Sequence, residues 1–399
     1  MKCKITNDLI EPFMSFGKMP SANGFLDKKD FDSEFFYEME VGFSKKVCLF
    51  QLNKFSNPKE VHSKKYPFYT ASSEYMKLHF KKYAEWLKKD YLNSNSKLIE
   101  IGSNDGTLLK NFSNTNIDFL GFEPSESVAN KATENNIKTI NKFFDIDNVK
   151  NLKNFKNNTD VICAANVIAH VPDLVNLIEA VNELLSAKGV FIFEEPYLGS
   201  MFNKVSYDQI YDEHIFMFSL TSIKKIFNLF DFELIDALPQ ITHGGSIRYV
   251  IGRKNKYKIN NRVNESLDNE KKQKLDDLSS CLKFKENCEA SRNKINSSLK
   301  KFKDEGKKIC GYAATAKSTT ILNYCNINSN TIEYICDTTE EKIGKFSPGS
   351  HIPVVPISHF KTNMPDVAYL FAWNHKNEIF SKEKEFDKKG GIWFSHVTL

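Results

Sequence analysis

The segment Leu98-Ile-Glu-Ile-Gly-Ser-Asn-Asp-Gly-Thr-Leu-Leu109 joins a short apolar run to a Gly-x-x-x-Gly turn, and a helical pattern follows the turn. A strand, a tight loop and a helix N-terminus in this order form a nucleoside-binding layout at the carboxyl edge of a parallel sheet. Gly102 and Gly106 let the backbone approach a ligand, while Glu100 and Asp105 add negative charge beside it. An ordinary strand–turn–helix unit is the alternative interpretation of this segment taken alone.

The next strand is expected over residues 116–123, and it ends on Glu123 about 20 residues after the glycines. A carboxylate at that place can accept hydrogen bonds from both hydroxyls of an adenosine ribose. Pro124 and Ser125 then open a helix, with Ser125 as its predicted N-cap. The acidic lining disfavours the pyrophosphate of a dinucleotide and suits the sulfonium of S-adenosylmethionine, which is therefore the predicted cofactor.

Strands alternate with helices from about residue 97 to residue 196. A third strand is expected over residues 160–165 and a fourth over residues 189–194, with a leucine-rich helix between them. Such alternation is typical of a parallel, doubly wound sheet, so the sequence predicts an α/β protein with a class I methyltransferase, Rossmann-like core. The candidate cofactor-binding residues follow the first three strands: Glu100, Gly102, Ser103, Asn104, Asp105, Gly106, Glu123, Pro124, Ser125 and Ala165.

Composition excludes several classes of protein. A chain of 399 residues predicts two or three domains, each with its own core. No apolar window is long enough for a membrane span, and the N-terminus lacks a secretory signal. The eight cysteines form no disulfide framework and predict reduced thiols in the cytoplasm. The net charge of +5 is spread over mixed runs such as residues 269–277, which indicates no nucleic-acid-binding stripe.

Four segments are expected along the chain. Residues 1–72 form a small, irregular N-terminal module with short β-like pieces. Residues 73–255 hold the cofactor-binding domain, in which the aromatic and polar stretch 196–218 suits an active-site loop. Residues 256–306 make a charged helical connector, and residues 307–399 make a second, Rossmann-like α/β unit.

In the last unit, a strand expected at residues 308–312 runs into a small-residue turn at residues 313–319, and a helix follows. Backbone N–H groups, hydroxyls and a lysine ammonium near a helix N-terminus suit a diphosphate. The glycine and lysine spacing is not that of a Walker loop, and tight helix–strand packing with an exposed lysine is the alternative. The candidate ligand-binding residues of this turn are Tyr312, Thr315, Lys317 and Ser318.

The order of these pieces resembles the nucleotide-sugar C-methyltransferases of deoxysugar biosynthesis, over nearly the whole chain. That family has a small N-terminal zinc-binding module, a central S-adenosylmethionine domain and a C-terminal Rossmann-like domain. The resemblance implies methyl transfer to a ring carbon alpha to the ketone of a nucleotide-linked keto-deoxysugar. It rests on six motifs in order: Glu-Ile-Gly-Ser-Asn-Asp-Gly (100–106), Glu-Pro-Ser (123–125), Asn-x-x-x-His (166–170), Tyr-Asp-Glu-His (211–214), His-Gly-Gly-Ser (243–246) and Gly-Tyr-Ala-Ala-Thr-Ala-Lys-Ser (311–318).

The N-terminus departs from the family pattern of two Cys-x-x-Cys pairs, the second of them just before a Gln-Leu pair. Here Cys3 stands alone, and Cys48 is displaced by one position before Gln51-Leu52. Two cysteines cannot close a four-ligand tetrahedral site, so we expect no zinc and no other metal. A makeshift site of Cys3, Cys48 and a histidine such as His62 is the alternative. Residues 66–73 resemble the family's aromatic-serine segment that closes over the cofactor.

Carbon methylation requires a carbanion equivalent, because an unactivated C–H bond is not nucleophilic. The α-proton of a 4-keto sugar is acidic enough for a positioned general base, and the resulting enolate attacks the sulfonium methyl. A base with a pKa near neutrality favours histidine. The family's functional residues match Tyr211, Glu213 and His214. His214 is the predicted base, Glu213 orients or charge-stabilises a histidine, and Tyr211 donates a hydrogen bond to the keto or enolate oxygen.

Asn166 and His170 leave the third strand where cofactor meets substrate. Asn166 is expected to contact the substrate, His170 is a second acid/base candidate, and His243 is a weaker one that we assign to substrate binding. A buried, hydrogen-bonded structural role is the competing interpretation for each histidine. Asp212 stands where relatives often have another histidine. Two other functions stay open: an O-methyltransferase acting on a sugar hydroxyl, and a non-catalytic nucleotide-sugar-binding protein.

Overall fold

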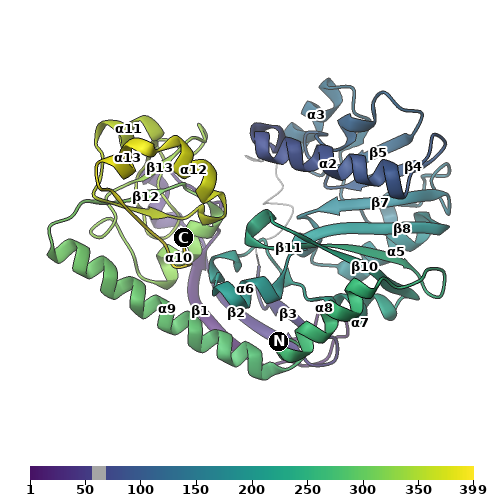
Figure 1. Cartoon of the computed structure of the whole chain (residues 1–399), viewed down its shortest axis with the longest axis horizontal. Coiled ribbons are helices and arrows are strands. Elements are labelled where there is room, and N and C mark those ends of the chain that lie inside the picture. The colour runs from purple at the N-terminus through teal and green to yellow at the C-terminus, as the bar shows by residue number, and fades with distance from the viewer. Residues whose placement is uncertain (56–68) are drawn as a thin grey trace.

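The computed structural model describes residues 1–55 and 69–399 of the chain (Figure 1). These described residues form a four-stranded N-terminal sheet, a seven-stranded central sheet and a five-stranded C-terminal sheet. In Figure 1 the central sheet lies at the right and the C-terminal sheet at the left, and strands of the N-terminal sheet lie low between them. An antiparallel sheet therefore joins two α/β units.

The central sheet has the strand order β10-β11-β8-β7-β4-β5-β6. Strands β4 to β8 run parallel to one another, whereas β11 is antiparallel to both β8 and β10. This arrangement confirms the predicted parallel, doubly wound sheet and adds an antiparallel strand near one edge. The strands are β4 (Lys97–Ile101), β5 (Asp118–Phe122), β6 (Thr139–Ile140), β7 (Thr159–Ala165), β8 (Leu185–Pro196), β10 (Phe232–Gln240) and β11 (Ser246–Arg253).

Helices bury both faces of the central sheet. Successive side chains of a strand point to opposite faces, so Val161 of β7 packs in the core beside α2 (Glu74–Asp90), and Ile162 packs beside α5 (Leu174–Leu184). Strands covered on both faces have near-continuous apolar sequences, which is why the runs stand out in this chain. The other helices of this unit are α3 (Glu126–Glu134), α4 (Ile146–Val149), α7 (Leu220–Asn228) and α8 (Asn261–Lys272).

The segment after the Gly102 loop differs from the prediction. It forms turns and the short 3-10 helix η3 (Leu109–Phe112), and not the expected α-helix. Asn111 donates its side-chain amide to the carbonyl oxygens of Thr107 and Leu108. Such side-chain bonds compete with the hydrogen bonds of an α-helix, and short apolar runs of this kind end as 3-10 turns. The Gly102 loop is therefore followed by turns and a 3-10 helix, without an α-helix behind it.

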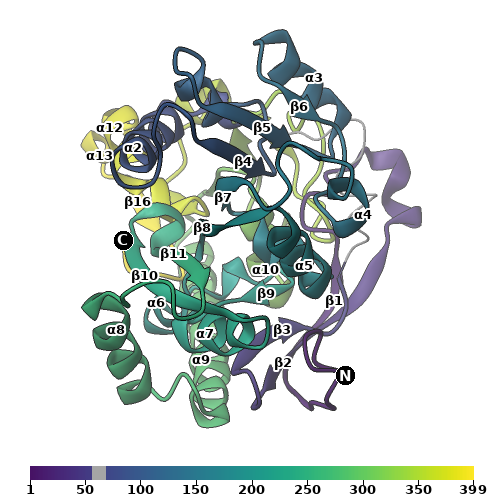
Figure 2. The same ribbon diagram turned by 90° about the vertical axis from the view of Figure 1, so that its right-hand side faces the viewer.

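The N-terminal sheet is more regular than the irregular module that the sequence predicts. Its strand order is β1-β2-β3-β9, and all pairs are antiparallel. A register shift between Ser15 and Lys18 interrupts the alternation of buried and exposed residues, which hides the first strand in the sequence. Figure 2 shows these strands below the central sheet. They are β1 (Pro12–Pro20), β2 (Phe36–Ser44), β3 (Leu49–Leu52) and β9 (Phe216–Met217).

The C-terminal sheet is entirely parallel, in the order β14-β13-β12-β15-β16. Its helix α10 begins at Ala316, within the stretch predicted as a turn, because Thr315 caps it by accepting a hydrogen bond from the Ser318 N–H. The strands are β12 (Ile309–Tyr312), β13 (Ile335–Asp337), β14 (Val354–Pro356), β15 (Val367–Leu370) and β16 (Ile392–Phe394). The helices are α10 (Ala316–Tyr324), α11 (Ile357–Thr362), α12 (Lys376–Lys382) and α13 (Lys384–Lys388).

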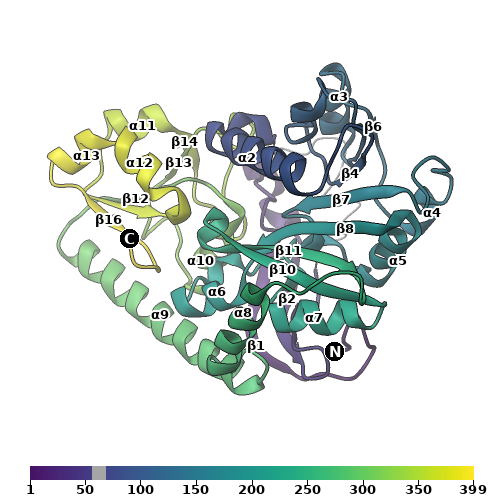
Figure 3. The ribbon, with the colours of Figure 1, turned by 45° about the vertical axis from the view of Figure 1, so that its right-hand side comes forward.

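The helix α9 (Leu278–Asp304) runs along the bottom of the molecule to the C-terminal unit (Figure 3). Its apolar side chains share one core with the N-terminal and C-terminal sheets. None of the helices in the described residues is long and apolar enough to span a bilayer. The predicted loop 196–218 contains α6 (Leu198–Lys204), η5 (Tyr207–Gln209) and β9. The other 3-10 helices are η1 (Lys28–Ser33), η2 (Thr70–Ser72), η4 (Ile168–His170), η6 (Thr242–Gly244) and η7 (Trp373–His375).

Candidate functional site

A cavity of about 810 Å³ opens at the carboxyl edge of the central sheet. It reaches Asn23, in the turn after β1, and the C-terminal unit. Most of the residues predicted from the sequence line it. The five catalytic candidates that do so are Asn166, His170, Tyr211, Glu213 and His214. The cofactor candidates are Glu100, Gly102, Ser103, Asn104, Glu123, Pro124 and Ala165, and the substrate candidates are His243, Thr315 and Lys317.

Five predicted residues lie behind the cavity wall. Asp105 accepts hydrogen bonds from the Ala71 N–H (2.8 Å) and the Thr107 hydroxyl (2.6 Å), and so anchors the turn before α2. Gly106 has a φ of +79° and packs so closely on Ile137 that a Cβ there would lie 2.8 Å from its side chain. These two residues shape the wall from behind.

The other three residues behind the wall are Ser125, Tyr312 and Ser318, and their side chains do not line the cavity. Ser125 occupies the N-cap position of α3, but its hydroxyl makes no capping hydrogen bond. The Tyr312 hydroxyl donates to Glu383 (3.0 Å) inside the C-terminal core, and the Ser318 hydroxyl donates to the Thr315 carbonyl (2.6 Å). The structure therefore separates these side chains from the residues that line the cavity.

The backbone of the Gly102 loop lies close to its neighbours. Gly102 has a φ of +64°, and a Cβ there would lie 2.5 Å from the Val167 side chain, so only glycine fits. The loop is held to the next strand because Glu123 accepts hydrogen bonds from the N–H groups of Asn104 (3.0 Å) and Ser125 (2.8 Å). The spacing between the glycines and the acid, which the sequence analysis singled out, thus has a structural basis.

This end of the cavity is lined by buried carboxyl groups. The Glu100 side chain is buried, and its Oε2 has no hydrogen-bond partner among the described residues. Burial, together with the charges of Asp105 and Glu123, raises the pKa of Glu100 well above its usual range. Burial also raises the pKa of Glu123. The hydrogen bonds from the Asn104 and Ser125 N–H groups lower it, but by less. Carboxylates gathered without a cation fit a positively charged ligand, as the sulfonium of S-adenosylmethionine is.

His214 is fixed at both ring nitrogens. Its Nδ1 lies 2.7 Å from the Gln209 carbonyl oxygen, which can only accept, so Nδ1 carries the proton. Its Nε2 lies 2.7 Å from the Tyr211 hydroxyl, which is therefore the donor in that hydrogen bond. Burial lowers the pKa of His214 to about 3, which keeps the imidazole neutral. The predicted base is thus held in one tautomer, with tyrosine on its acceptor nitrogen.

A buried glutamate that the sequence analysis did not select positions the segment after β7. The Oε1 atom of Glu195 accepts hydrogen bonds from the N–H groups of Val167 (2.9 Å), Ile168 (2.6 Å) and Ala169 (3.2 Å). Burial raises the pKa of Glu195 to about 8. The Glu-Glu pair at the end of an apolar strand was the available signal for this residue, because acids in buried strands need partners.

The segment that Glu195 holds carries Asn166 and His170 into the cavity. Asn166 has a φ of +57°, a strained conformation of the kind that collects at ligand sites. Its Oδ1 is buried and has no hydrogen-bond partner among the described residues, which leaves it available to a ligand. The His170 ring lies 5.0 Å from the His214 ring, centroid to centroid. The two histidines of the predicted site are therefore neighbours.

The opposite end of the cavity is lined by the C-terminal unit. The Lys317 side chain is buried, and its ammonium has no hydrogen-bond partner among the described residues. It lies 5.2 Å from the centroid of the Trp373 ring. Burial lowers the pKa of Lys317, against the negative charge of Asp208, which raises it. An unpaired cation over an aromatic ring fits an anionic ligand.

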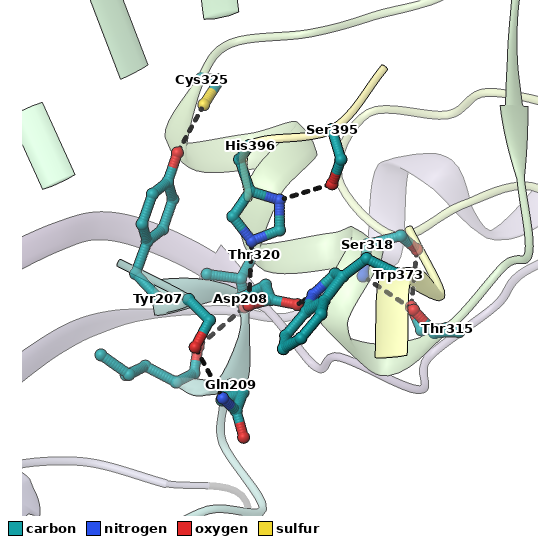
Figure 4. Close-up of polar contacts among 12 residues, drawn as sticks. Tyr207, Asp208, Gln209, Thr315, Ser318, Thr320, Cys325, Trp373, Ser395 and His396 are labelled. Atoms are coloured by element: carbon teal, nitrogen blue, oxygen red, sulfur yellow. Dashed lines mark hydrogen bonds and ion pairs between the residues drawn. The ribbon is translucent and has the colours of Figure 1, made fainter. Parts of the chain in front are cut away.

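A buried polar network ties the C-terminal strand end to the loop that carries His214 (Figure 4). Asp208 accepts a hydrogen bond from Trp373 Nε1 (2.7 Å) and lies 3.0 Å from His396 Nε2. Burial opposes the ionised form of Asp208, but His396, Lys317 and Trp373 together outweigh burial and lower the pKa of Asp208. The next residue, Gln209, holds His214. The sequence analysis did not select Asp208 or His396, because they are far apart in the chain and belong to no common motif.

The two N-terminal cysteines lie in separate cores, Cys3 with the central unit and Cys48 with the N-terminal sheet. The Cys48 sulfur lies 3.0 Å from the Lys225 ammonium. Within residues 1–55 and 69–399, no group of three or more His, Cys, Asp or Glu side chains is arranged to hold a metal ion. His62 and the first part of the 66–73 segment lie outside the described residues.

Comparisons with known proteins match both α/β units. A family profile described as "C-methyltransferase C-terminal domain" matches residues 241–397, and one described as "Methyltransferase domain" matches residues 73–237. C-methyltransferase NovU of Streptomyces niveus is 27% identical over 381 residues, which cover 95% of this chain and 90% of that protein.

Two solved methyltransferases each match less than half of this chain. Magnesium protoporphyrin IX methyltransferase of Synechocystis PCC 6803, solved with bound SAH, is 14% identical with a TM-score of 0.35, over 45% of this chain and 83% of its own. A SAM-dependent methyltransferase of Anabaena variabilis is 17% identical with a TM-score of 0.35, over 44% of this chain and 84% of its own.

The two profiles together span the central and C-terminal units, and the alignment with NovU runs through nearly the whole chain. The strand order of the central sheet, its glycine loop and its acidic cofactor end agree with these matches. The chain is therefore an S-adenosylmethionine-dependent C-methyltransferase with a class I methyltransferase core.

Proposed function

We propose that the enzyme methylates a ring carbon alpha to the ketone of a nucleotide-linked keto-deoxysugar, through an enolate. The observation that carries the proposal is the Tyr211–His214 pair, a neutral acid–base couple in the same cavity as an acidic end and a basic end. The acidic end suits the methyl donor and the basic end suits a diphosphate. The reacting carbon then lies between them, beside a group able to remove a proton.

At the acidic end, Gly102, Glu100 and Glu123 are the residues that we expect to hold the cofactor. S-adenosylmethionine supplies an electrophilic methyl group on a sulfonium when it is bound. Glu123 ends β5 and would accept from the ribose hydroxyls, exchanging its present N–H partners in part. A bound cation would favour the ionised form of Glu100, whose buried Oε2 has no partner among the described residues, and the two charges would then attract each other.

Proton removal follows from the hydrogen bonds of His214. Its Nε2 is bonded to Tyr211, so we propose that the α-proton of the sugar passes to the Tyr211 oxygen while the tyrosine's own proton passes to Nε2. This relay modifies the direct role that the sequence analysis gave to His214. Glu213 lines the same cavity, and its negative charge would stabilise the imidazolium that forms.

At the basic end, Lys317 and the Thr315 cap of α10 are the proposed diphosphate ligands. Lys342 also lines the cavity, and its ammonium donates to the Ala314 carbonyl (2.8 Å). Two ammonium groups and a capped helix N-terminus would bind the two phosphates. We propose that Asn166 and His243 contact the sugar, because both line the cavity near the histidine pair.

The test is incubation of the purified enzyme with methyl-labelled donor and a panel of nucleotide-linked keto-sugars, with the product located by carbon-13 NMR. We expect the label on carbon, and we expect exchange of the α-hydrogen in deuterated water when the donor is omitted. Methylation of the reduced, hydroxyl form of the sugar would instead establish an O-methyltransferase. Donor binding without turnover on any acceptor would establish a non-catalytic binding protein.

A further inference from the structure

The N-terminal turn at residues 21–24 enters the cavity next to the catalytic candidates. The turn follows β1 and is closed by a hydrogen bond from the Gly24 N–H to the Ser21 carbonyl. Its middle residue Ala22 is buried, and the Ala22 carbonyl accepts a hydrogen bond from the Thr319 hydroxyl of α10 (2.8 Å). Asn23 lines the cavity itself. The N-terminal sheet therefore contributes a side chain to a site otherwise built by the two α/β units.

Two consecutive buried carboxylates accept hydrogen bonds from this turn. Asp212 accepts hydrogen bonds from the Ser21 hydroxyl (2.9 Å) and the Ala22 N–H (3.1 Å), one at each oxygen. Glu213 accepts a hydrogen bond from the Asn23 side-chain amide (2.5 Å) at Oε1. A carboxylate accepts, and an amide or hydroxyl donates, so each contact favours the ionised acid. Three consecutive residues of the turn thus contact two consecutive acids some 190 positions later in the chain.

We propose that Asn23 is a positioning residue of the methyl-transfer site, which holds the Glu213 carboxylate, and that Asp212 latches the turn that carries Asn23. The inference rests on the role proposed above for Glu213, and it adds the N-terminal sheet to the catalytic machinery. It also gives a role to Asp212, which precedes Glu213 in the Tyr-Asp-Glu-His segment.

The charges around Glu213 set the direction of the effect. Burial raises the pKa of Glu213 to about 7, and the Asp212 charge adds to this rise. The Asn23 hydrogen bond and the Lys342 ammonium lower it. Tyr37 also faces the two acids, and its own pKa is raised by burial and by their charges. His214 follows Glu213 and stays neutral. Loss of the Asn23 amide would therefore raise the pKa of Glu213.

The test compares Asn23→Ala and Asn23→Asp with the wild type, as kcat against pH. We expect the acid limb of the profile to move to higher pH in both variants, further in Asn23→Asp because it adds a negative charge. A rise of one unit in the pKa of Glu213 lowers kcat about tenfold on the acid side of the limb, and activity recovers at high pH. Affinity for S-adenosylhomocysteine and thermal stability stay within the range of the control.

The matched control is Asn53→Ala. Asn53 donates its side-chain amide to Glu40 (2.8 Å) in the same N-terminal sheet, but it does not line the cavity. Asn53→Ala removes the same kind of hydrogen bond, and we expect the acid limb of its kcat profile to stay at the wild-type pH. An equal loss of kcat at all pH values in the Asn23 variants, or the same profile in Asn53→Ala, would overturn the positioning role.

A second readout separates this inference from the proposed reaction. Carbon-13 labelling of glutamate carboxyl groups, with the Glu213 signal assigned by its loss in Glu213→Gln, follows the titration of Glu213 without any substrate. An upward shift in the Asn23 variants supports the contact even if the wild type methylates no keto-sugar, in which case only the proposed function fails. An unchanged titration overturns the inference, whatever the enzyme methylates.

Discussion

The carboxyl edges of the central and C-terminal sheets share one backbone arrangement. In the central sheet, Glu123 at the end of β5 accepts a hydrogen bond from the Asn104 N–H in the loop after β4 (3.0 Å). In the C-terminal sheet, Asp337 at the end of β13 accepts one from the Ala314 N–H in the loop after β12 (2.5 Å). Each acid ties the first loop of its unit to the second strand, as in nucleoside-binding α/β folds.

The two edges differ in the charge that they leave unpaired. The central edge buries Glu100, whose Oε2 has no hydrogen-bond partner in the described part of the chain. The C-terminal edge buries Lys317, whose ammonium has no hydrogen-bond partner there either. A buried charge is unfavourable until a partner arrives. Under the proposed function, one arrangement of strands would serve a cationic ligand at the central edge and an anionic ligand at the C-terminal edge, and Glu100 and Lys317 would distinguish them.

The largest effect is expected where the two edges meet. We expect His214→Gln to lower kcat about 10²- to 10⁴-fold, because the terminal proton acceptor is removed. Binding at either edge stays within about twofold, since glutamine keeps the hydrogen-bonding capacity toward Tyr211 and Gln209. Single-turnover kinetics and calorimetry measure the two quantities. His359→Gln is the control, because this histidine lies in the C-terminal unit away from the cavity. A kcat near that of the wild type would show that the chemistry is carried elsewhere.

The next effect separates the edges. Lys317→Met keeps the length of the side chain and removes its charge, so we expect affinity for a nucleoside diphosphate to fall about 10- to 100-fold. S-adenosylhomocysteine affinity stays unchanged, because the central edge keeps its contacts. Isothermal titration measures both dissociation constants, and the exposed Lys361→Met is the control. If the two affinities fell together, the edges would not be separate ligand sites.

The opposite substitution tests the acidic edge. Glu100→Gln removes an acid whose folded pKa is raised, so the wild-type protein loses stability as pH rises above the unfolded pKa of about 4.3. The ligand-free variant is therefore expected to unfold at a higher temperature than the wild type at pH 7, and the difference vanishes near pH 4. S-adenosylmethionine affinity falls about tenfold, because a charge-assisted contact is lost. A ligand-free variant less stable than the wild type at pH 7 would show that this carboxylate is paired.

Much of this comparison could be predicted from local sequence. The Gly102 loop and Glu123 stand at a fixed spacing on one unit, and the apolar strands of a sheet covered on both faces are continuous in the chain. Those features depend on residues close in sequence. The central sheet and its glycine loop were accordingly predicted, while the α-helix expected after the loop was not formed because Asn111 bonds to the backbone there.

The contacts between units could not be predicted from one sequence. The contact of Asp208 with His396 and the hydrogen bond of Ser21 to Asp212 join residues 188 and 191 positions apart, and no periodicity or motif indicates such pairs. The N-terminal strand β1 was not predicted for a different reason. Its bulge breaks the alternation of buried and exposed residues on which strand prediction depends.

The smallest effect concerns a residue that sequence reasoning placed at the basic edge. Tyr312 ends β12, but its hydroxyl donates to Glu383 within the C-terminal core and it does not line the cavity. Tyr312→Phe is therefore expected to lower stability by about 1–2 kcal/mol, because Glu383 loses a donor while the ring still packs. Nucleoside diphosphate affinity stays within about 1.5-fold of the wild type, in contrast with Lys317→Met. Thermal unfolding and titration of the same samples give both values. A loss of affinity comparable to that of Lys317→Met would place Tyr312 among the ligand contacts and move the basic edge toward β12.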